Sequence, residues 1–120
     1  MKLNYAVLGT NNMEASTKFY DSLFEQTEFN QVLSTERMTF WQGDDRDSAF
    51  AVASPFNEEP ATNGNGSMFG FGVGSTEEVE RLHKKAIELG GTCEGEPNQR
   101  GPRFSAYVRD LDKNKICFSV

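Results

Sequence analysis

Apolar and polar positions along this chain follow a plan that occurs twice. The first copy opens on an apolar stretch at 3–8, which predicts a strand. Asn11 and Glu14 resemble a capping box, and apolar residues at helical spacing continue to Phe24, which predicts a helix. Three short strands are then expected, at 29–34, 37–42 and 48–54.

The second copy has the same order of elements. A strand is expected at 68–73, and Ser75 with Glu78 forms a capping box for a helix whose apolar positions continue to Leu89. Gly90-Gly91 is typical of a helix end. Short strands are expected at 92–94, 103–109 and 115–120, with a hairpin turn at 110–114. The repetition indicates a duplicated module.

A loop rich in turn-forming residues separates the copies. The stretch 55–67 has two prolines and two Asn-Gly steps. We therefore predict one α+β domain over residues 1–120, with two β-α-β-β-β modules at about 1–54 and 68–120 that are joined by this loop.

Strand alternation predicts that one sheet face is lined by small side chains. Phe69 and Phe71 alternate with Gly70 and Gly72, and the period of two places each set on one face. The large set is expected to pack on the helices. The small set leaves volume unfilled, so we expect a curled mixed sheet that forms a cleft. The alternative is a solvated sheet face.

Charge and composition exclude several classes of binding partner. The formal net charge is −6, which argues against a nucleic-acid-binding face and favours a small local site. No apolar stretch is long enough to span a membrane, and the first residues lack the apolar core of a signal peptide. The two cysteines form no disulfide framework. We expect a cytoplasmic protein that binds neither nucleic acid nor membrane.

Four short motifs, in this order, support a family resemblance: Tyr5–Glu14, Phe19-Tyr20, Gly90-Gly91 and Tyr107–Ile116. Together they resemble the vicinal oxygen chelate superfamily, which includes glyoxalase I, bleomycin-resistance proteins and extradiol dioxygenases. The resemblance implies the paired-module fold, its cleft and a homodimer. It does not imply one reaction, because one fold carries many activities.

The resemblance also implies where a divalent metal would bind. The family's ligand positions fall on Tyr5, Ala53, Met68 and Cys117. These residues replace the imidazoles and carboxylates that such metals prefer. The one histidine, His83, is expected on the surface of the second helix, away from these strands. We therefore expect no metal at this site and no other cofactor.

Candidate ligand contacts come from the same strand faces. Aromatic residues could form a wall with polar tips, and a guanidinium at Arg103 suits a carboxylate or phosphate. The alternatives are core packing for the aromatic residues and, for Arg100 and Arg109, pairing with surface acids. The predicted ligand contacts are Tyr5, Trp41, Met68, Arg103, Tyr107 and Cys117.

The leading functional hypothesis is a glyoxalase-like protein that binds a small, partly apolar molecule in the cleft without a metal, with Arg103 holding an anionic group of that molecule. Sequestration and metal-independent catalysis both fit this hypothesis, so the sequence leaves open whether the protein is an enzyme; an enzyme would be a glyoxalase-related lyase or isomerase. The alternative is a metal-dependent lyase or dioxygenase with non-standard ligands. A purely structural role is the third possibility.

Overall fold

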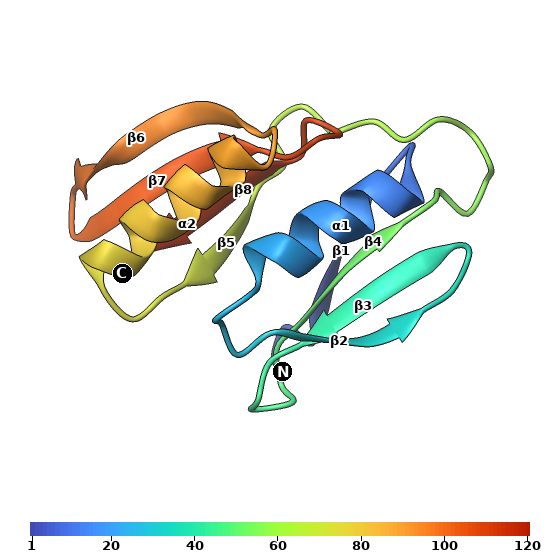
Figure 1. Ribbon diagram of the computed structural model, residues 1–120, viewed down its shortest axis with the longest axis horizontal. Helices are drawn as coiled ribbons and strands as arrows, with labels where there is room; N and C mark the ends of the chain where they lie inside the picture. Colours follow the sequence, from blue (N-terminus) through green and yellow to red (C-terminus); the bar gives the residue numbers. More distant parts are fainter. The chain divides into compact units, whose positions relative to one another are not determined.

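The chain forms two compact units with the same order of elements (Figure 1). The computed structural model describes residues 1–120, which divide into unit 1, Met1–Asn63, and unit 2, Gly64–Val120. Unit 1 contains β1 (Tyr5–Gly9), α1 (Met13–Leu23), β2 (Asn30–Ser34), β3 (Met38–Gln42) and β4 (Ala49–Ala53). Unit 2 contains β5 (Phe69–Gly72), α2 (Thr76–Glu88), β6 (Thr92–Arg100), β7 (Arg103–Arg109) and β8 (Lys115–Ser119). The prediction of two β-α-β-β-β modules is confirmed.

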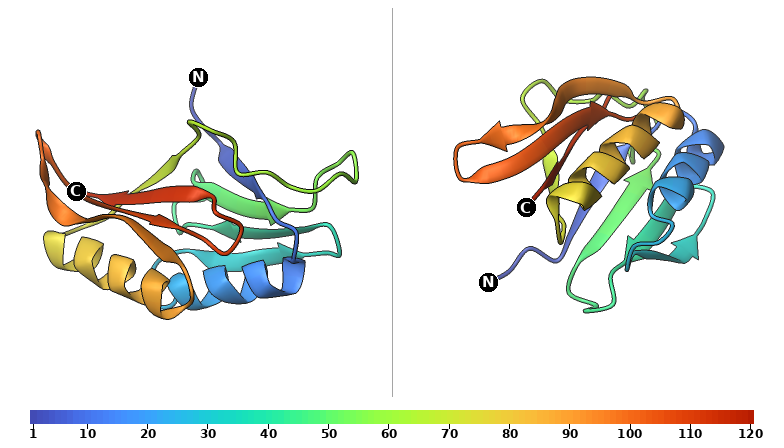
Figure 2. Two further views of the ribbon diagram at one scale, coloured as in Figure 1. Left: turned by 90° about the horizontal axis from the view of Figure 1, so that it is seen from above. Right: turned by 60° about the vertical axis from the view of Figure 1, so that its left-hand side comes forward.

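Each unit has its own four-stranded mixed sheet. The strand orders are β1-β4-β3-β2 and β5-β8-β7-β6. The first strand of each unit runs parallel to the last, and the other pairs are antiparallel. The two sheets therefore have equivalent topology, as duplication predicts. Each helix covers one face of its own sheet and leaves the other face without a helix (Figure 2).

The core of unit 1 is an aromatic cluster between α1 and its sheet. Tyr20 of α1 and Phe24, the C-cap of that helix, contact Trp41 and Phe50 of the sheet, with ring centroids 4.7 Å apart for Tyr20 and Phe50. Trp41 is 1% exposed and donates a hydrogen bond through Nε1 to Asp21 Oδ1 at 2.8 Å. The expected position of Trp41 in an open ligand wall is therefore wrong, because the strand register turns its ring towards the helix.

The helix contributes aliphatic side chains to the core of unit 2. Val79, Leu82 and Ala86 of α2 are buried, as are Val108 and Ile116 of the sheet. These residues have the parity that the sequence predicts for packing on a helix. The side chains on the opposite face of the same strands consequently do not take part in packing against α2.

The helix ends differ in detail from the prediction. Asn12, rather than Asn11, caps α1 by accepting a hydrogen bond from the backbone N–H of Ala15. Asn11 instead exchanges two hydrogen bonds with the backbone of Ala61. Ser75 caps α2 as predicted. Neither helix has the length and apolar run needed to cross a membrane.

Strand β6 is much longer than predicted. It continues through Gly95 and Pro97 to Arg100, past two irregularities in its pairing with β7. Gly and Pro ordinarily interrupt strands, and for this reason the sequence pattern predicts only 92–94. The long strand ends in a two-residue turn that pairs Arg100 with Arg103.

Gly91, which follows α2, provides a test of how closely the end of this helix packs against β7. A Cβ at this position would lie 2.7 Å from the carbonyl oxygen of Arg109 and 2.8 Å from that of Ala86. We predict that Gly91→Ala lowers the free energy of unfolding by about 1–3 kcal/mol, because backbone atoms must move. Gly74→Ala is the control, since no atom lies within 4 Å of its added Cβ. Urea unfolding curves measure both, and equal midpoints for the two variants would contradict the close approach.

Candidate functional site

The face of unit 2's sheet that lies away from α2 gathers polar and small side chains. Pairing places Tyr107 beside Cys117, Ser105 beside Ser119, and Cys117 beside Gly70. Arg100 pairs with Arg103 at the end of β6 and β7 and shares this face. We call this surface the open face of unit 2. Its residues are Gly70, Gly72, Arg100, Arg103, Ser105, Tyr107, Arg109, Lys115, Cys117 and Ser119.

Two glycines leave space on this face. A Cβ added at Gly70 or Gly72 would meet no atom within 4 Å. Both residues lie in β5, which is paired with β8 in parallel. The surface beside Cys117 and Ser119 is therefore open, and a small molecule can approach the strand backbone there.

The Arg100 guanidinium is held over the ring of Tyr107. Its Nη1 donates to the carbonyl oxygen of Ser105, and its Nη2 donates to that of Glu96 at 2.8 Å. Its Cζ lies 5.0 Å from the centroid of the Tyr107 ring, a distance at which a cation–π attraction operates. A Cβ at Gly95 would lie 2.7 Å from Cδ2 of that ring. The missing side chain at Gly95 therefore permits this close packing.

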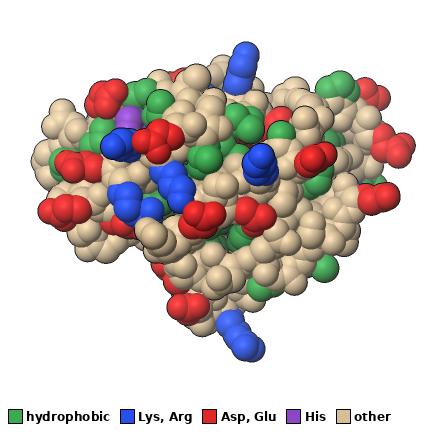
Figure 3. Space-filling view, in the orientation of Figure 1, with side chains coloured by type: hydrophobic (Ala, Val, Ile, Leu, Met, Phe, Trp, Pro, Cys, Tyr) green, Lys and Arg blue, Asp and Glu red, His purple; other side chains and the backbone are tan.

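Three cations on the open face lack an ion-pair partner. Lys115 places its Nζ 5.3 Å from the centroid of the Tyr107 ring. Lys115, Arg100 and Arg103 form no direct ion pair, although the charge of Lys115 contributes to the lowered pKa of Glu94. The neighbouring Arg109 differs, because it binds Glu94 at 2.9 Å and holds the pKa of that carboxyl below its usual value. Elsewhere the charges are mixed: acidic and basic side chains are interspersed on the face shown in Figure 3.

The thiol and hydroxyls of this face are neutral hydrogen-bonding groups. Burial raises the pKa of the Cys117 thiol, while the positive charge of Arg100 and a hydrogen bond with Ser119 act in the opposite direction. Ser105 Oγ donates to the Tyr107 hydroxyl at 3.4 Å. No residue of the open face is a histidine or a carboxylate, so Cys117 has no base beside it to form the thiolate a nucleophile requires.

The structure brings several of the predicted ligand contacts together. Arg103, Tyr107 and Cys117 share the open face of unit 2, and Met68, which is exposed, directly precedes β5. Tyr5 lies in unit 1, on the sheet face away from α1, where its ring contacts Phe40 edge to face at 5.6 Å.

The sequence pattern favours Arg103 over Arg100 as a ligand contact and does not indicate Lys115 as one. The missed signal is the Gly101-Pro102 turn. A two-residue hairpin loop makes the residues on either side of it direct partners, and direct partners share a sheet face. Recognition of that hairpin would have placed Arg100 beside Arg103.

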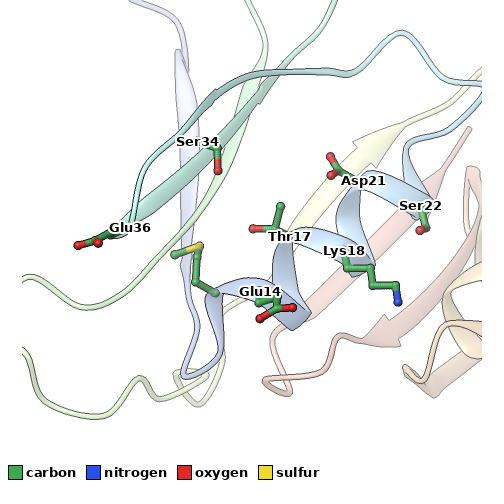
Figure 4. Close-up of a pocket in the computed structure, with 8 residues that line it drawn as sticks. Glu14, Thr17, Lys18, Asp21, Ser22, Ser34 and Glu36 are labelled. Carbon is green, nitrogen blue, oxygen red and sulfur yellow. The ribbon is translucent and has the colours of Figure 1, made fainter.

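Unit 1 contains a separate groove beside α1. It has a volume of about 500 Å³ and lies between the helix and residues 34–36 (Figure 4). Its lining mixes charges, since Glu14, Asp21 and Glu36 line it together with Lys18. It contains neither histidine nor cysteine. Its residues are Met13, Glu14, Thr17, Lys18, Asp21, Ser22, Ser34 and Glu36.

Comparison with known proteins identifies the family. The model of the Glyoxalase/Bleomycin resistance protein/Dioxygenase superfamily matches residues 2–118. The chain belongs to this superfamily. A glyoxalase/bleomycin resistance protein from Albidiferax ferrireducens T118 is 35% identical, with a TM-score of 0.89 over 98% of this chain and 96% of that one.

More distant members of the glyoxalase superfamily share the fold. A glyoxalase-related enzyme from Fulvimarina pelagi is 18% identical, with a TM-score of 0.81 over 98% of this chain and 86% of that one. A lactoylglutathione lyase from Agrobacterium tumefaciens is 20% identical, with a TM-score of 0.72 over 98% and 92%. Likeness at this level of identity shows the fold alone. The search of curated proteins gave no match.

The residues at the superfamily's metal-ligand positions do not fit a divalent metal. Ala53 has no donor atom and is buried in β4. Cys117 is a protonated thiol, 6% exposed, among hydroxyl groups. Met68 supplies a thioether and Tyr5 a phenol, neither of which replaces imidazole or carboxylate. We therefore derive no chemistry from a metal at these positions.

The raised pKa of Cys117 gives a testable pH dependence. We predict that, in a Cys93→Ser background, alkylation of Cys117 by iodoacetamide accelerates with pH and is still rising above the ordinary thiol pKa. Arg100→Gln should slow the reaction at each pH, because a cation that stabilises the thiolate is lost. Mass spectrometry over a pH series measures the rate. A plateau at neutral pH, or a faster reaction in Arg100→Gln, would contradict the assignment.

Proposed function

We propose that the protein binds a small molecule through an anionic group on the open face of unit 2. The observation that carries the proposal is the set of three cations without ion-pair partners, Arg100, Arg103 and Lys115, around one tyrosine. They gather in a chain whose formal net charge is −6. A carboxylate or phosphate provides an ion-pair partner for these three cations.

The strand pairing supports this proposal. Arg100 and Arg103 are direct cross-strand partners. Like charges in this arrangement repel and destabilise the sheet. Pairing with surface acids is the alternative role for Arg100, but neither Arg100 nor Arg103 forms an ion pair. A bound anion would relieve the repulsion between the two guanidinium groups. The unfavourable pairing of Arg100 with Arg103 therefore favours a ligand-binding role.

The Arg100 guanidinium is also held in position in the absence of a ligand. Two backbone carbonyls and the Tyr107 ring fix its position. Such preorganisation reduces the entropy lost on binding. The space above Gly70 and Gly72 is available for the body of the ligand, and the hydroxyls of Ser105 and Tyr107 lie beside it.

This arrangement supports binding rather than a catalysed reaction. The open face has no general base, and its thiol holds its proton. Sequestration of a small anionic molecule is therefore the function that we favour within the superfamily. A metal-dependent lyase or dioxygenase is not favoured, because the donor atoms at the superfamily's ligand positions are unsuitable.

Benzoate and benzamide provide a matched pair of probes, since they differ mainly in charge. We predict that isothermal titration calorimetry detects benzoate binding and much weaker benzamide binding. Arg100→Gln should weaken benzoate binding by about 10- to 100-fold, the equivalent of one charge-assisted hydrogen bond of about 1.5–3 kcal/mol. Arg81→Gln is the control, because Arg81 is paired with Glu78 on α2.

A second variant tests the position of the ligand. Gly70→Leu should block binding while the fold is retained, because its side chain would enter the open space beside Cys117. Far-ultraviolet circular dichroism checks the fold. Equal affinities for benzoate and benzamide, or unchanged benzoate binding in both Arg100→Gln and Gly70→Leu, would refute the proposal.

We also infer that the protein is a homodimer. The edge strand β2 is exposed along its whole length, with Val32 57% and Leu33 52% exposed. Exposed apolar edge strands favour pairing with another chain. Multi-angle light scattering should therefore give the mass of two chains, and Val32→Lys should shift the population towards one. A mass of one chain for the unaltered protein at micromolar concentration would contradict the inference.

A further inference from the structure

A second cluster of reactive side chains lies in unit 2, apart from the open face. His83 projects from α2, and Cys93 and Glu96 come from β6. His83 Nε2 lies 3.3 Å from Cys93 Sγ, and Sγ lies 3.4 Å from Glu96 Oε1. The three ligand atoms all lie within 4.8 Å of one another. The expected surface position of His83 is wrong, because its side chain is only 6% exposed and contacts Cys93.

The irregular course of β6 creates this juxtaposition. In a regular strand, residues three apart point to opposite faces. The pairing of β6 with β7 is shifted between Cys93 and Gly95 and again between Gly95 and Asn98. These shifts bring Glu96 to the same side as Cys93, against the histidine of the helix. Bulges that redirect side chains in this way are common beside functional sites.

The donor set is the one that zinc prefers. Zinc binds thiolate sulfur at about 2.3 Å and imidazole nitrogen or carboxylate oxygen at about 2.0–2.2 Å, in tetrahedral geometry. Those bond lengths place neighbouring ligand atoms about 3.5 Å apart. The two separations from Cys93 Sγ, 3.3 and 3.4 Å, are close to this value, and the His83 and Glu96 ligand atoms lie within 4.8 Å of each other. Cys93 and Glu96 are exposed, so an ion can enter from solvent.

We propose that His83, Cys93 and Glu96 form a zinc-binding site with water as the fourth ligand. On binding, the Cys93 thiol releases its proton to solvent and the thiolate sulfur bonds the metal, so proton release accompanies zinc uptake. This site shares no residue with the superfamily's metal positions or with the proposed anion site. An alternative role for Cys93 as a nucleophile is disfavoured, because its thiol donates to the Glu96 carboxylate.

Metal titration of chelator-treated protein tests the proposal. We expect one equivalent of Zn²⁺ per chain by calorimetry, together with proton release that depends on the buffer. Co²⁺ should give a tetrahedral visible spectrum and a thiolate-to-cobalt charge-transfer band. Cys93→Ser and Glu96→Gln should each weaken zinc binding by about 100-fold or more, since even the loss of an indirect partner costs about 10- to 100-fold. Both side chains are exposed, so these variants should fold.

Cys117→Ser is the matched control, because it removes the other cysteine. It should retain zinc affinity and the cobalt charge-transfer band. Absence of zinc binding in the unaltered protein, or binding that survives Cys93→Ser, would overturn the proposal and leave the cluster as a hydrogen-bonded group only. Binding that is lost in Cys117→Ser but kept in Cys93→Ser would place the metal at the superfamily's position instead.

Discussion

Each module has one helix, which can cover only one of the two faces of its sheet. This constraint decides which side chains are buried in the core and which remain free to bind other molecules. The helix buries one set of alternating side chains, and the other set is left without a helical partner. In unit 1 the buried set includes Trp41 and Phe50, and in unit 2 it includes Val108 and Ile116. Function must therefore be sought on the uncovered faces and at the edges of the sheets.

In unit 2 the uncovered face is neither apolar nor fully solvated. Glycines leave space on one strand, and Arg100 is fixed over Tyr107 by backbone carbonyls. Its charge and that of Arg103 remain without acidic partners. A cationic surface with its own hydrogen-bonded support is suited to binding an anion. Membership of the glyoxalase superfamily is compatible with this role, because the fold hosts many activities.

The sequence predicts the fold well because strand alternation and helix caps are local signals. Strands β7 and β8 alternate clearly, so their inward and outward faces were predicted correctly. In β3, Phe40 and Trp41 are adjacent aromatic residues, and alternation alone cannot decide which one faces the helix. The structure resolves this ambiguity in favour of Trp41, which bonds to Asp21 in the helix.

The candidate sites were less predictable because they depend on contacts between distant elements. Arg100 joins the open face through a strand that contains glycine and proline, two residues that obscure strand patterns. The contact of His83 with Cys93 depends on how α2 packs against β6 and on the shifted pairing in that strand. Neither contact produces a periodic signal in the sequence.

Anion binding on the open face of unit 2 can be tested by locating a bound anion in a crystal. Crystals soaked in 4-bromobenzoate would report the ligand's position through the anomalous scattering of bromine. We expect bromine density on the open face of unit 2, with the carboxylate within hydrogen-bonding distance of Arg100 and the ring above Gly70 and Gly72. Bromine density confined to other surfaces, with the open face occupied by ordered water alone, would contradict this expectation.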